Sequence, residues 1–457
     1  MPANDKDYLL IPSSPLVFGT GKPLDFGLGG DTLDFPFPPT LAGALRAAEQ
    51  TAKGQDANPF AASPTLGNDP AAATATLGPA ALARVHVANG AAELLFTPPA
   101  DAVYFNIPSL HVRALCPADR EDDVYTDLDE PGDVHRPGAA PLQLLRFSPP
   151  LSDDEKPADP PTAWTASELE HWLARAPVAA EFAAPTGVDG TGRDARSHVS
   201  IRESTRGADA GLLFRTTGRD FSARLSEWAP PAAPENAVAP DRPRPVIGGA
   251  VDWRAMVDEQ ARIKREQRVA QAPQNVVQST TAFHFDFAIA LRANSAAELN
   301  GVVRRVGGEG RFARIQRASA PLKWPEAPAN LPTVIGDGAS ARVRFVLITP
   351  AQFAGGWAPC ETLARGVGNG GEGWFTRCGV TCRIAAVALP RAQAFSGWQK
   401  GNDGEVGPGL PARIVPAGTV YWLEVKQGNP PSALHNQSLC ADELAADGWG
   451  FGLVGLA

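Results

Sequence analysis

Proline and glycine are the feature that most restricts how this chain can fold. Its 457 residues include 44 prolines and 45 glycines. Proline breaks helices and removes a hydrogen-bond donor from central strands, and glycine destabilises the interior of either element. We therefore expect short strands joined by many irregular loops, and the composition excludes a helical bundle or a solenoid.

The length predicts two or three domains, each with its own core. Hydrophobic residues at 44% and charged residues at 20% match soluble globular proteins and exclude wholesale disorder. Prolines such as Pro12 and Pro15 interrupt every apolar stretch before the roughly 20 residues that a bilayer requires. The N-terminus has no signal pattern, and five cysteines form no disulfide framework. The sequence therefore predicts a cytoplasmic protein without a membrane role.

The N-terminal half combines short predicted strands with two predicted helices. Residues 8–11 form the first strand, and a helix over 41–51 follows a loop rich in glycine and proline, with Thr40 as its N-cap. Thr165 and Glu168 form a capping box before an amphipathic helix. Further strands are predicted at residues 82–87, 93–96, 102–105, 142–147, 198–201 and 212–215.

The C-terminal half repeats this pattern. Apolar residues alternate strictly with other residues from 283 to 291, which predicts a strand with one buried face. Ser295 and Glu298 form a second capping box, so we expect a helix there and a returning strand over 311–317. More strands are predicted at residues 341–348, 381–389 and 419–425. The fold prediction is α+β, with two ferredoxin-like domains.

Alanine and proline dominate residues 229–245, a composition typical of a linker. A basic stretch with helical character follows at 262–268. We therefore predict three segments: an N-terminal domain over 1–228 with an acidic insertion, a linker with the basic stretch over 229–279, and a C-terminal domain over 280–457 with a glycine-rich end.

Charge is distributed unevenly along the chain. The net charge of -9 argues against a protein that coats nucleic acid through bulk positive charge. Residues 119–133 hold most of an acidic insertion, whereas residues 300–323 are strongly basic. The basic residues of the second stretch are Arg304, Arg305, Arg311, Arg314, Arg317 and Lys323, with Glu309 as the one acid. This stretch is a candidate phosphate-binding patch.

The motifs of common enzymes and cofactor sites are absent. Gly450, Gly452 and Gly455 have GxGxxG spacing but lie at the chain end, with no room for the helix of a Rossmann site. They predict a glycine-rich turn or strand, or a backbone surface that RNA or a partner approaches closely. There is no Walker A, HExxH or GxSxG sequence. No cofactor is expected.

The cysteines leave one metal hypothesis open. Cys360, Cys378, Cys382 and Cys440 could join His435 in a zinc site, although their spacing matches no standard zinc motif. Buried, inert thiols are the simpler interpretation.

Two further features suggest RNA. The loop of Gly307, Gly308, Glu309, Gly310 and Arg311 could cradle a phosphodiester with its amides and guanidinium, or it could be a plain hairpin turn. Trp398 and Trp422 could stack on bases, although isolated aromatic residues more often belong to the core.

Several strings, taken together and in order, resemble the third Cmr subunit of type III-B CRISPR systems, a family of the RAMP superfamily. The strings are GKPLDFG from Gly21, PPTLAGALRAA from Pro38, LLFTPPADAVYF from Leu94, HVSIRESTRGADAGLLF from His198, FSGWQ from Phe395 and RIVPAGTVYWLE from Arg413. Residues 119–161 and 229–268 have no counterpart in this resemblance.

The resemblance implies a noncatalytic subunit with two ferredoxin-like, RRM-like domains that acts in antiviral defence. Such a subunit binds the 5′ repeat-derived handle of the guide RNA, the crRNA, at the foot of a multisubunit effector. Its other partners are the large polymerase-like subunit and a RAMP backbone subunit, and it meets target RNA indirectly through the complex.

The resemblance also implies RNA-binding residues in three places. They are Gly43 and Arg46 on the first helix, Arg202, Thr205 and Arg206 at a turn, and Gly307, Gly308 and Arg311 in the glycine-rich loop. For Arg46, the alternative is a salt bridge that closes the last turn of its helix.

Two other functions compete with the RNA-binding scaffold. One is a RAMP endoribonuclease that processes precursor crRNA, with His86 and His198 as candidate general acid and base. Each histidine could equally be a structural residue of a strand. The other is a protein-binding adaptor whose acidic loop docks a basic partner and whose arginines are merely solvated.

Overall fold

The computed structural model describes 21 stretches of the chain, of which 13 are longer than four residues. These stretches are residues 5–12, 18, 35–54, 75–86, 90–105, 111–118, 143–148, 150–151, 155–158, 160, 163–175, 182–183, 285–307, 312–332, 340–354, 356–359, 374–395, 398–400, 406–408, 412–426 and 430–457. One compact unit comprises Met1–Phe221 and His284–Ala457. The second unit, Ser222–Phe283, lies outside the described residues, as do the predicted strands at 198–201 and 212–215 and the basic stretch at 262–268.

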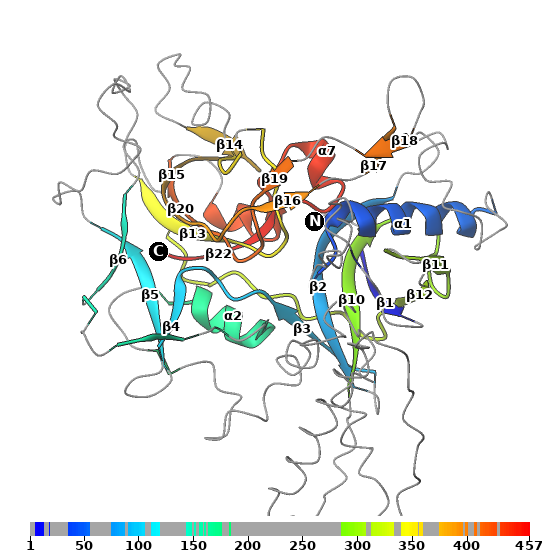
Figure 1. Cartoon of the computed structure of the whole chain (residues 1–457), viewed down its shortest axis with the longest axis horizontal. Helices are drawn as coiled ribbons and strands as arrows, with labels where there is room; N and C mark the ends of the chain where they lie inside the picture. Colours follow the sequence, from blue (N-terminus) through cyan, green and yellow to red (C-terminus); the bar gives the residue numbers. More distant parts are fainter. Residues whose placement is uncertain are drawn as a thin grey trace, which may run out of the picture. The chain divides into compact units, whose positions relative to one another are not determined.

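The first sheet is antiparallel and has seven strands in the order β11-β12-β1-β10-β2-β3-β8 (Figure 1). The strands are β1 (Lys6–Pro12), β2 (Thr76–His86), β3 (Ala92–Phe96), β8 (Trp164–Thr165), β10 (Phe285–Asn294), β11 (Val303–Arg305) and β12 (Phe312–Arg317). The strands predicted at 8–11, 82–87, 93–96 and 311–317 are therefore confirmed, with β2 extending further toward the N-terminus.

Strand β10 occupies the centre of this sheet. Its alternating sequence is confirmed as a strand, and it pairs with β1 on one side and β2 on the other. β10, β11 and β12 lie in the segment predicted as the C-terminal domain, because local sequence pattern does not reveal which strands they pair with. In the structure all three strands complete the sheet that begins with β1. How the chain divides into domains stays a prediction.

Helix α1 (Pro38–Ala52) covers one face of the first sheet. Its buried residues Leu41, Leu45 and Ala48 pack against Tyr8 and Leu10 of β1. The predicted start at residue 41 with Thr40 as N-cap is wrong: Phe37 is the N-cap, and prolines occupy the first turn. Proline suits this place because its missing N–H would have no partner within the helix.

Glu49 fixes the end of α1 against two other segments. This buried carboxylate accepts hydrogen bonds from Ala75 N at 2.9 Å, Ser295 Oγ at 3.1 Å and Ala296 N at 3.0 Å. The helix predicted after the Ser295 and Glu298 capping box is not formed: residues 295–302 are turns and irregular backbone. Ser295 donates to Glu49, which lies 246 positions away in sequence, so a long-range contact overrides the local pattern.

The second sheet is antiparallel and has six strands. Its order is β14-β15-β20-β13-β22-β21. The strands are β13 (Ala341–Leu347), β14 (Phe375–Arg377), β15 (Val380–Ala388), β20 (Val420–Val425), β21 (Gln437–Ser438) and β22 (Phe451–Leu456). The strands predicted at 341–348, 381–389 and 419–425 are confirmed.

The two sheets share one arrangement of their four central strands. In chain order, the four central strands are β1, β2, β10 and β12 in the first sheet, and β13, β15, β20 and β22 in the second. In each sheet the fourth of these strands lies beside the first, the first beside the third, and the third beside the second: β12-β1-β10-β2 and β22-β13-β20-β15. This is the strand order of ferredoxin-like folds. Between the last two of these strands, the described residues of the first sheet form turns and β11 without a helix, and the second sheet has the short η2 (Pro431–Leu434) and α7 (Asp442–Ala445). The sheet-rich α+β class is established, and the two ferredoxin-like domains stay a prediction.

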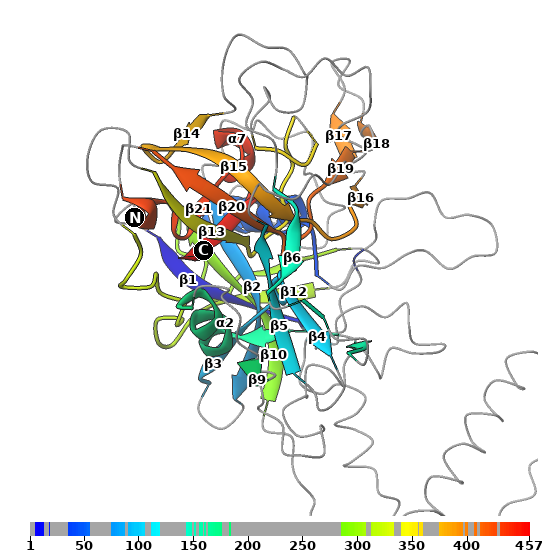
Figure 2. The ribbon, with the colours of Figure 1, turned by 90° about the vertical axis from the view of Figure 1, so that its left-hand side faces the viewer.

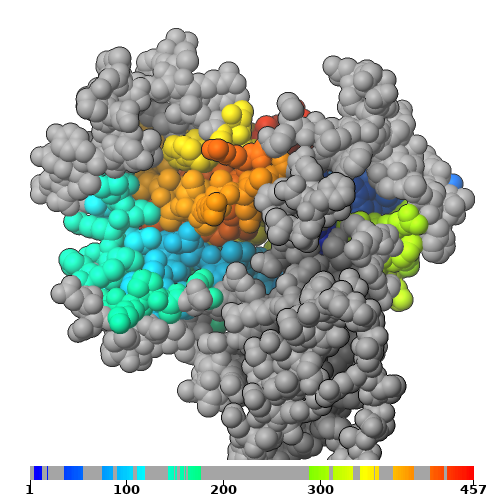
Figure 3. All heavy atoms as spheres, viewed as in Figure 1, coloured from blue at the N-terminus to red at the C-terminus, as the bar shows by residue number. Residues whose placement is uncertain are grey.

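A third, smaller sheet is formed by short strands that precede, interrupt and follow the acidic insertion. It comprises β4 (Ala102–Phe105), β5 (His111–Pro117), β6 (Leu145–Phe147), β7 (Pro157–Ala158) and β9 (Phe182–Ala183). Two further pairs of short strands are β16 (Gln393–Phe395) with β19 (Ala412–Ile414), and β17 (Trp398–Lys400) with β18 (Val406–Pro408). Figure 3 shows the third sheet (cyan) against β15 (orange), where Gln143 N donates to Ala385 O at 2.8 Å. Most of the acidic insertion lies outside the described residues.

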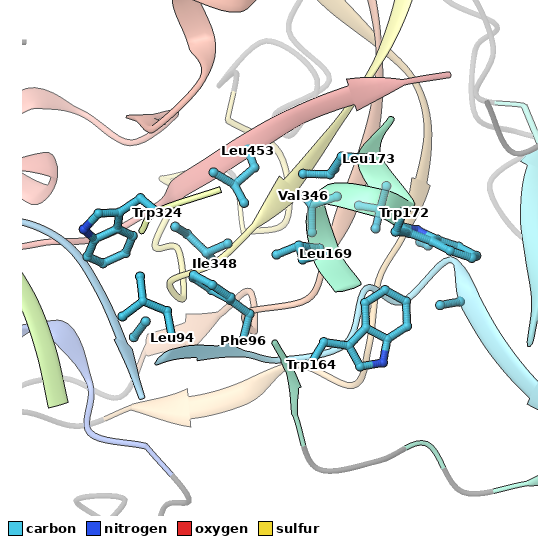
Figure 4. Packing of buried hydrophobic residues seen from close by; sticks show 14 of the residues in the cluster. Leu94, Phe96, Trp164, Leu169, Trp172, Leu173, Trp324, Val346, Ile348 and Leu453 are labelled. Carbon is cyan, nitrogen blue, oxygen red and sulfur yellow. The ribbon is translucent and has the colours of Figure 1, made fainter. Parts of the chain in front are cut away.

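Helix α2 (Ala166–Leu173) begins at the predicted capping box. The Thr165 side chain accepts from Glu168 N, and the Glu168 carboxylate accepts from Thr165 N. Figure 2 shows α2 beside β3. Leu169, Trp172 and Leu173 enter a large core that includes Phe96 of the first sheet and residues of the second sheet (Figure 4).

The same core decides between the two interpretations of Trp422, base stacking and packing in the core. Trp422 of β20 is fully buried in it and is therefore a core residue, whereas the side chain of Trp398 lies outside the described part of the chain. None of the helices in the described ranges has the length and apolarity needed to cross a bilayer.

Candidate functional site

The β11–β12 hairpin places the basic stretch at the edge of the first sheet. Its register pairs Val303 with Arg314, Arg304 with Ala313, and Arg305 with Phe312. Paired residues of antiparallel strands point to the same face of the sheet. The first and third pairs therefore share one face, and Arg304 with Ala313 shares the other, which α1 covers.

Arg304 is a structural residue, and this corrects part of the predicted phosphate-binding patch. It is 5% exposed, and its Nη2 donates to Ala47 O of α1 at 3.0 Å. A guanidinium held in this way joins the hairpin to the helix. Its charge is not available to a ligand on the opposite face.

The opposite face of the hairpin combines cations with apolar surface. We call Val303, Arg305, Phe312 and Arg314 the outer face of the hairpin. Val303 is 39% exposed, Arg314 is exposed, and Arg305 and Phe312 are half-buried. The guanidinium carbon of Arg305 lies 5.6 Å from the centre of the Phe312 ring, within the range of a cation–π contact.

The glycine-rich loop joins these two strands. Gly307 is exposed and has φ of 75°, a left-handed conformation that favours glycine. Gly308 and Arg311 lie outside the described residues, and so do Arg202, Thr205, Arg206 and His198. The backbone of His86 is described as the end of β2, but its side chain is not.

The two predicted residues on α1 have different surroundings. Gly43 is half-buried, and a methyl group added there would have no neighbour within 4 Å among the described residues. Arg46 forms a salt bridge with Asp447 and donates from Nε to Ala75 O at 3.4 Å. The salt bridge proposed as the alternative for Arg46 is present, but its partner lies in the C-terminal segment and not in the helix. Arg304 of the hairpin donates to the carbonyl oxygen of Ala47, the residue that follows Arg46 in α1. The structure therefore places the hairpin next to the part of α1 that contains Arg46.

The terminal glycines serve packing within the chain. Gly450 has φ of 72°, and Gly452 and Gly455 belong to β22, which lies between β13 and β21. A Cβ atom on Gly452 would lie 2.6 Å from Val346 O, and one on Gly455 would lie 3.0 Å from the Leu173 Cα. The interpretation as a turn and strand is confirmed, and the close approach is made by the protein's own backbone.

The comparisons with known proteins identify the family. A family model described as CRISPR-associated protein (Cas_Cmr3) matches residues 8–456. The chain belongs to the Cas_Cmr3 family. The resemblance stated from six short strings is therefore confirmed across nearly the whole sequence.

Solved structures similar to this Cas_Cmr3 family member include a subunit of a CRISPR complex. It is a chain from the cryo-EM structure of the Type III-B Cmr-beta bound to cognate target RNA, with 10% sequence identity and a TM-score of 0.28. The match covers 91% of this chain and 86% of that chain. A search of curated proteins gives no significant match.

Among the described residues of this Cas_Cmr3 family member, the hypothetical zinc ligands are not brought together. In the part of the chain that the structure describes, no three His, Cys, Asp or Glu side chains are grouped to hold a metal ion. His435 uses both ring nitrogens on the backbone: Nε2 lies 2.8 Å from Pro325 O, and Nδ1 accepts from Val454 N at 3.1 Å. Cys382 and Cys440 are buried, as the simpler interpretation expected, whereas Cys378 is exposed and Cys360 lies outside the described residues.

His435 predicts a pH dependence of stability. Burial lowers the pKa of His435 below its usual value near 6.5, although its two backbone hydrogen bonds act in the opposite direction. The unfolded chain therefore binds a proton more readily than the folded one as the pH falls below about 6.5. We expect the free energy of unfolding to decrease from pH 7.5 to pH 5.5, and to decrease less in His435→Gln. Urea titrations at both pH values measure this difference, and equal decreases in the two proteins would contradict it.

The outer face of the hairpin contains residues that sequence reasoning missed. The charge pattern predicts the arginines as one cluster and does not identify Val303 or Phe312 as site residues. The available signal was the alternation of side chains between the two faces of a strand. Once a hairpin is assumed, this alternation places Arg305 and Phe312 on the face opposite Arg304. The register itself could not be read from the sequence, since residues 308–311 allow more than one loop length.

Proposed function

We propose that this protein is a noncatalytic RNA-binding subunit of a type III-B CRISPR ribonucleoprotein. In this role it binds the 5′ repeat-derived handle of the crRNA and docks the large polymerase-like subunit and a RAMP backbone subunit. Target RNA reaches it through the complex. We further propose that each large sheet is the centre of a ferredoxin-like domain and that the complex acts in the cytoplasm.

One structural observation supports RNA binding independently of family membership. The β11–β12 hairpin turns Arg305 and Arg314 to the same face, and both lie on the opposite side of the sheet from the buried Arg304. Because phosphate contacts depend on exposed guanidinium groups, this division separates the arginines that can bind a backbone from the one that holds α1. A net charge of -9 is compatible with such a local surface.

The proposal predicts how two arginines contribute to RNA affinity. In the double variant Arg305→Gln/Arg314→Gln, we expect affinity for handle-bearing RNA to fall about 10- to 100-fold at low salt. Each lost phosphate contact lowers the slope of log K against log salt by about 0.7 for a single strand, so the double variant should lose about 1.4. Fluorescence anisotropy with labelled RNA over a range of salt concentrations measures both quantities.

The matched control changes the same charge elsewhere. Arg391 and Arg413 are exposed and lie outside the first sheet, so Arg391→Gln/Arg413→Gln should bind RNA like the wild type. Unchanged affinity in the hairpin variant would favour the protein-binding adaptor. Incubation with repeat RNA tests the endoribonuclease hypothesis: metal-independent cleavage that is lost in His86→Ala or His198→Ala would overturn the noncatalytic assignment.

A further inference from the structure

The hydrogen-bonding pattern of the hairpin shows which backbone groups of β11 face its partner strand. Ile315 N donates to Val302 O at 2.8 Å, just before β11 begins. Successive pairs in an antiparallel ladder alternate between hydrogen-bonded and non-hydrogen-bonded pairs. From this starting point, the pair of Val303 is not hydrogen-bonded, the pair of Arg304 is, and the pair of Arg305 is not.

The N–H and C=O groups of Val303 and Arg305 therefore point away from β12. β11 is the last strand of the first sheet, and no strand within the described ranges pairs with its far side (Figure 1). Among the residues that the structure describes, no further backbone hydrogen bond uses these four groups. Equivalent groups two positions apart in a strand are separated by about 6.8 Å. The open edge of β11 thus offers donors and acceptors in alternation.

Guanidinium groups lie on both sides of this open edge. Arg305 and Arg314 belong to the outer face of the hairpin, and Arg304 lies on the opposite face with α1. Val303 is 39% exposed, so solvent reaches the edge. Sheet edges with free N–H groups are suited to anions, and the surrounding positive charge strengthens this preference.

An RNA strand matches this edge better than DNA or a protein strand does. Its phosphate oxygens accept hydrogen bonds from N–H groups, and its 2′-hydroxyl groups donate to carbonyl oxygens. DNA has the phosphates but lacks the 2′-hydroxyl donors. β11 has only three residues and arginines beside it, and proteins use short, charged edges to prevent pairing with other protein strands.

We propose that the open edge of β11 selects RNA over DNA through its main chain. The N–H groups of Val303 and Arg305 donate to phosphate oxygens, and their carbonyl oxygens accept hydrogen bonds from 2′-hydroxyl groups. This inference rests on the proposed RNA-binding function and adds to it the chemical feature of the nucleic acid that is recognised.

Nucleic acids that differ only in the sugar test the carbonyl contacts. Two hydrogen bonds from 2′-hydroxyl groups contribute about 5- to 150-fold in affinity. We expect the wild-type protein to bind handle-bearing single-stranded RNA more tightly than its all-deoxy counterpart by a factor in this range. Single 2′-deoxy substitutions, moved along the handle, should weaken binding at neighbouring positions. Fluorescence anisotropy with labelled strands measures each affinity.

A proline at position 303 removes one of the proposed donors. The N–H group of Val303 points away from β12, and proline is tolerated on edge strands in this orientation. A hydrogen bond to a charged group contributes about 10- to 150-fold, so Val303→Pro should weaken RNA binding within this range. Val303→Ala keeps the N–H group and should bind like the wild type. In Val303→Pro, the single 2′-deoxy substitutions should also have smaller effects, because the RNA no longer lies against the edge.

The matched proline control lies on the edge of the second sheet. Thr376 of β14 pairs with Thr381, whose carbonyl oxygen accepts from Lys426 N at 2.8 Å on the other side of β15. The N–H group of Thr376 therefore also points to an open edge. Thr376→Pro should bind RNA like the wild type.

The outcomes separate this inference from the function on which it rests. If the wild-type protein binds no RNA, the proposed function fails. If it binds RNA and DNA equally well, or if Val303→Pro binds RNA as tightly as Val303→Ala, the inference is wrong and the RNA-binding function stands. Loss of partner subunits from Val303→Pro with normal RNA affinity would also overturn it, because the edge would then pair with a protein strand. If thermal unfolding shows that Val303→Pro misfolds, the 2′-deoxy series on the wild-type protein decides.

Discussion

Replacing Arg344 with leucine is expected to lower the free energy of unfolding by about 3–5 kcal/mol. Arg344 of β13 is 1% exposed and forms an ion pair with Asp101, with Nη1 donating to Oδ2 at 2.6 Å. Its Nη2 donates to the carbonyl oxygens of Trp172 at 2.8 Å and Arg175 at 2.5 Å, and its Nε donates to Leu456 O at 2.5 Å. One side chain therefore joins the second sheet, the end of α2 and the loop before β4.

The loss is large because of what remains after the substitution. Asp101 is completely buried, and within the described part of the chain its carboxylate would keep only the hydrogen bond from Trp172 Nε1 at 3.0 Å. A buried carboxylate without a cation is costly, whereas removing both charges of such a pair is often tolerated. The double variant Arg344→Leu/Asp101→Asn should therefore recover part of the stability in urea titrations.

An exposed ion pair provides the control for Arg344. Lys6 and Glu298 lie 3.3 Å apart with side chains 35% and 51% exposed. Pairs of this kind contribute about 0–1 kcal/mol. A loss in Arg344→Leu no larger than in Lys6→Leu would contradict the role given to the buried pair.

Adding one methyl group at Gly452 is expected to destabilise the protein by about 3 kcal/mol, at the upper end for overpacking. The new Cβ would overlap the Phe345 ring and lie 2.6 Å from Val346 O. The ring could rotate, but the carbonyl oxygen belongs to the backbone of β13, to which β22 is hydrogen-bonded. Relief therefore requires the two central strands to separate. Urea unfolding of Gly452→Ala measures the effect.

The same substitution at Gly43 is expected to have the opposite effect on stability. It lies inside α1, and no atom of the described residues is within 4 Å of an added Cβ. Alanine is favoured over glycine in helices by about 0.5–1 kcal/mol, so Gly43→Ala should be slightly more stable than the wild type. Similar losses in the two variants would show that local space does not govern these sites. The RNA affinity of Gly43→Ala separately tests the role that the family resemblance assigns to this residue.

Local patterns predicted the elements of this fold better than their partners. The alternation before Leu291 identified β10, and the Thr165 capping box identified α2, because both signals depend on neighbouring residues only. The same capping pattern at Ser295 gave no helix, since Glu49 of α1 takes its hydroxyl group as a donor. The position of β10 between β1 and β2 depends on contacts across most of the chain, which sequence periodicity does not contain.

In the candidate site, too, the sequence predicted the element but not the contacts of its individual residues. The basic hairpin was predicted from charge and glycine content, and the structure places it at a sheet edge. Charge alone could not distinguish Arg304, bonded to Ala47, from Arg305, which lies over Phe312. That distinction depends on register and on the helix above one face. The turn at Arg202, Thr205 and Arg206 stays a prediction.

The central place of β10 affects how the protein is made. On a ribosome that adds about 5–20 residues per second, β1 and β2 would wait roughly 10–40 s for the strand that fits between them. During this time each strand has an unpaired edge where β10 will bind, and such edges readily pair with other chains. We therefore expect the nascent chain to depend on chaperones until β10 leaves the exit tunnel. An RNA or subunit that recognises the first sheet and its basic hairpin can select only chains whose synthesis has passed Arg317, the end of β12.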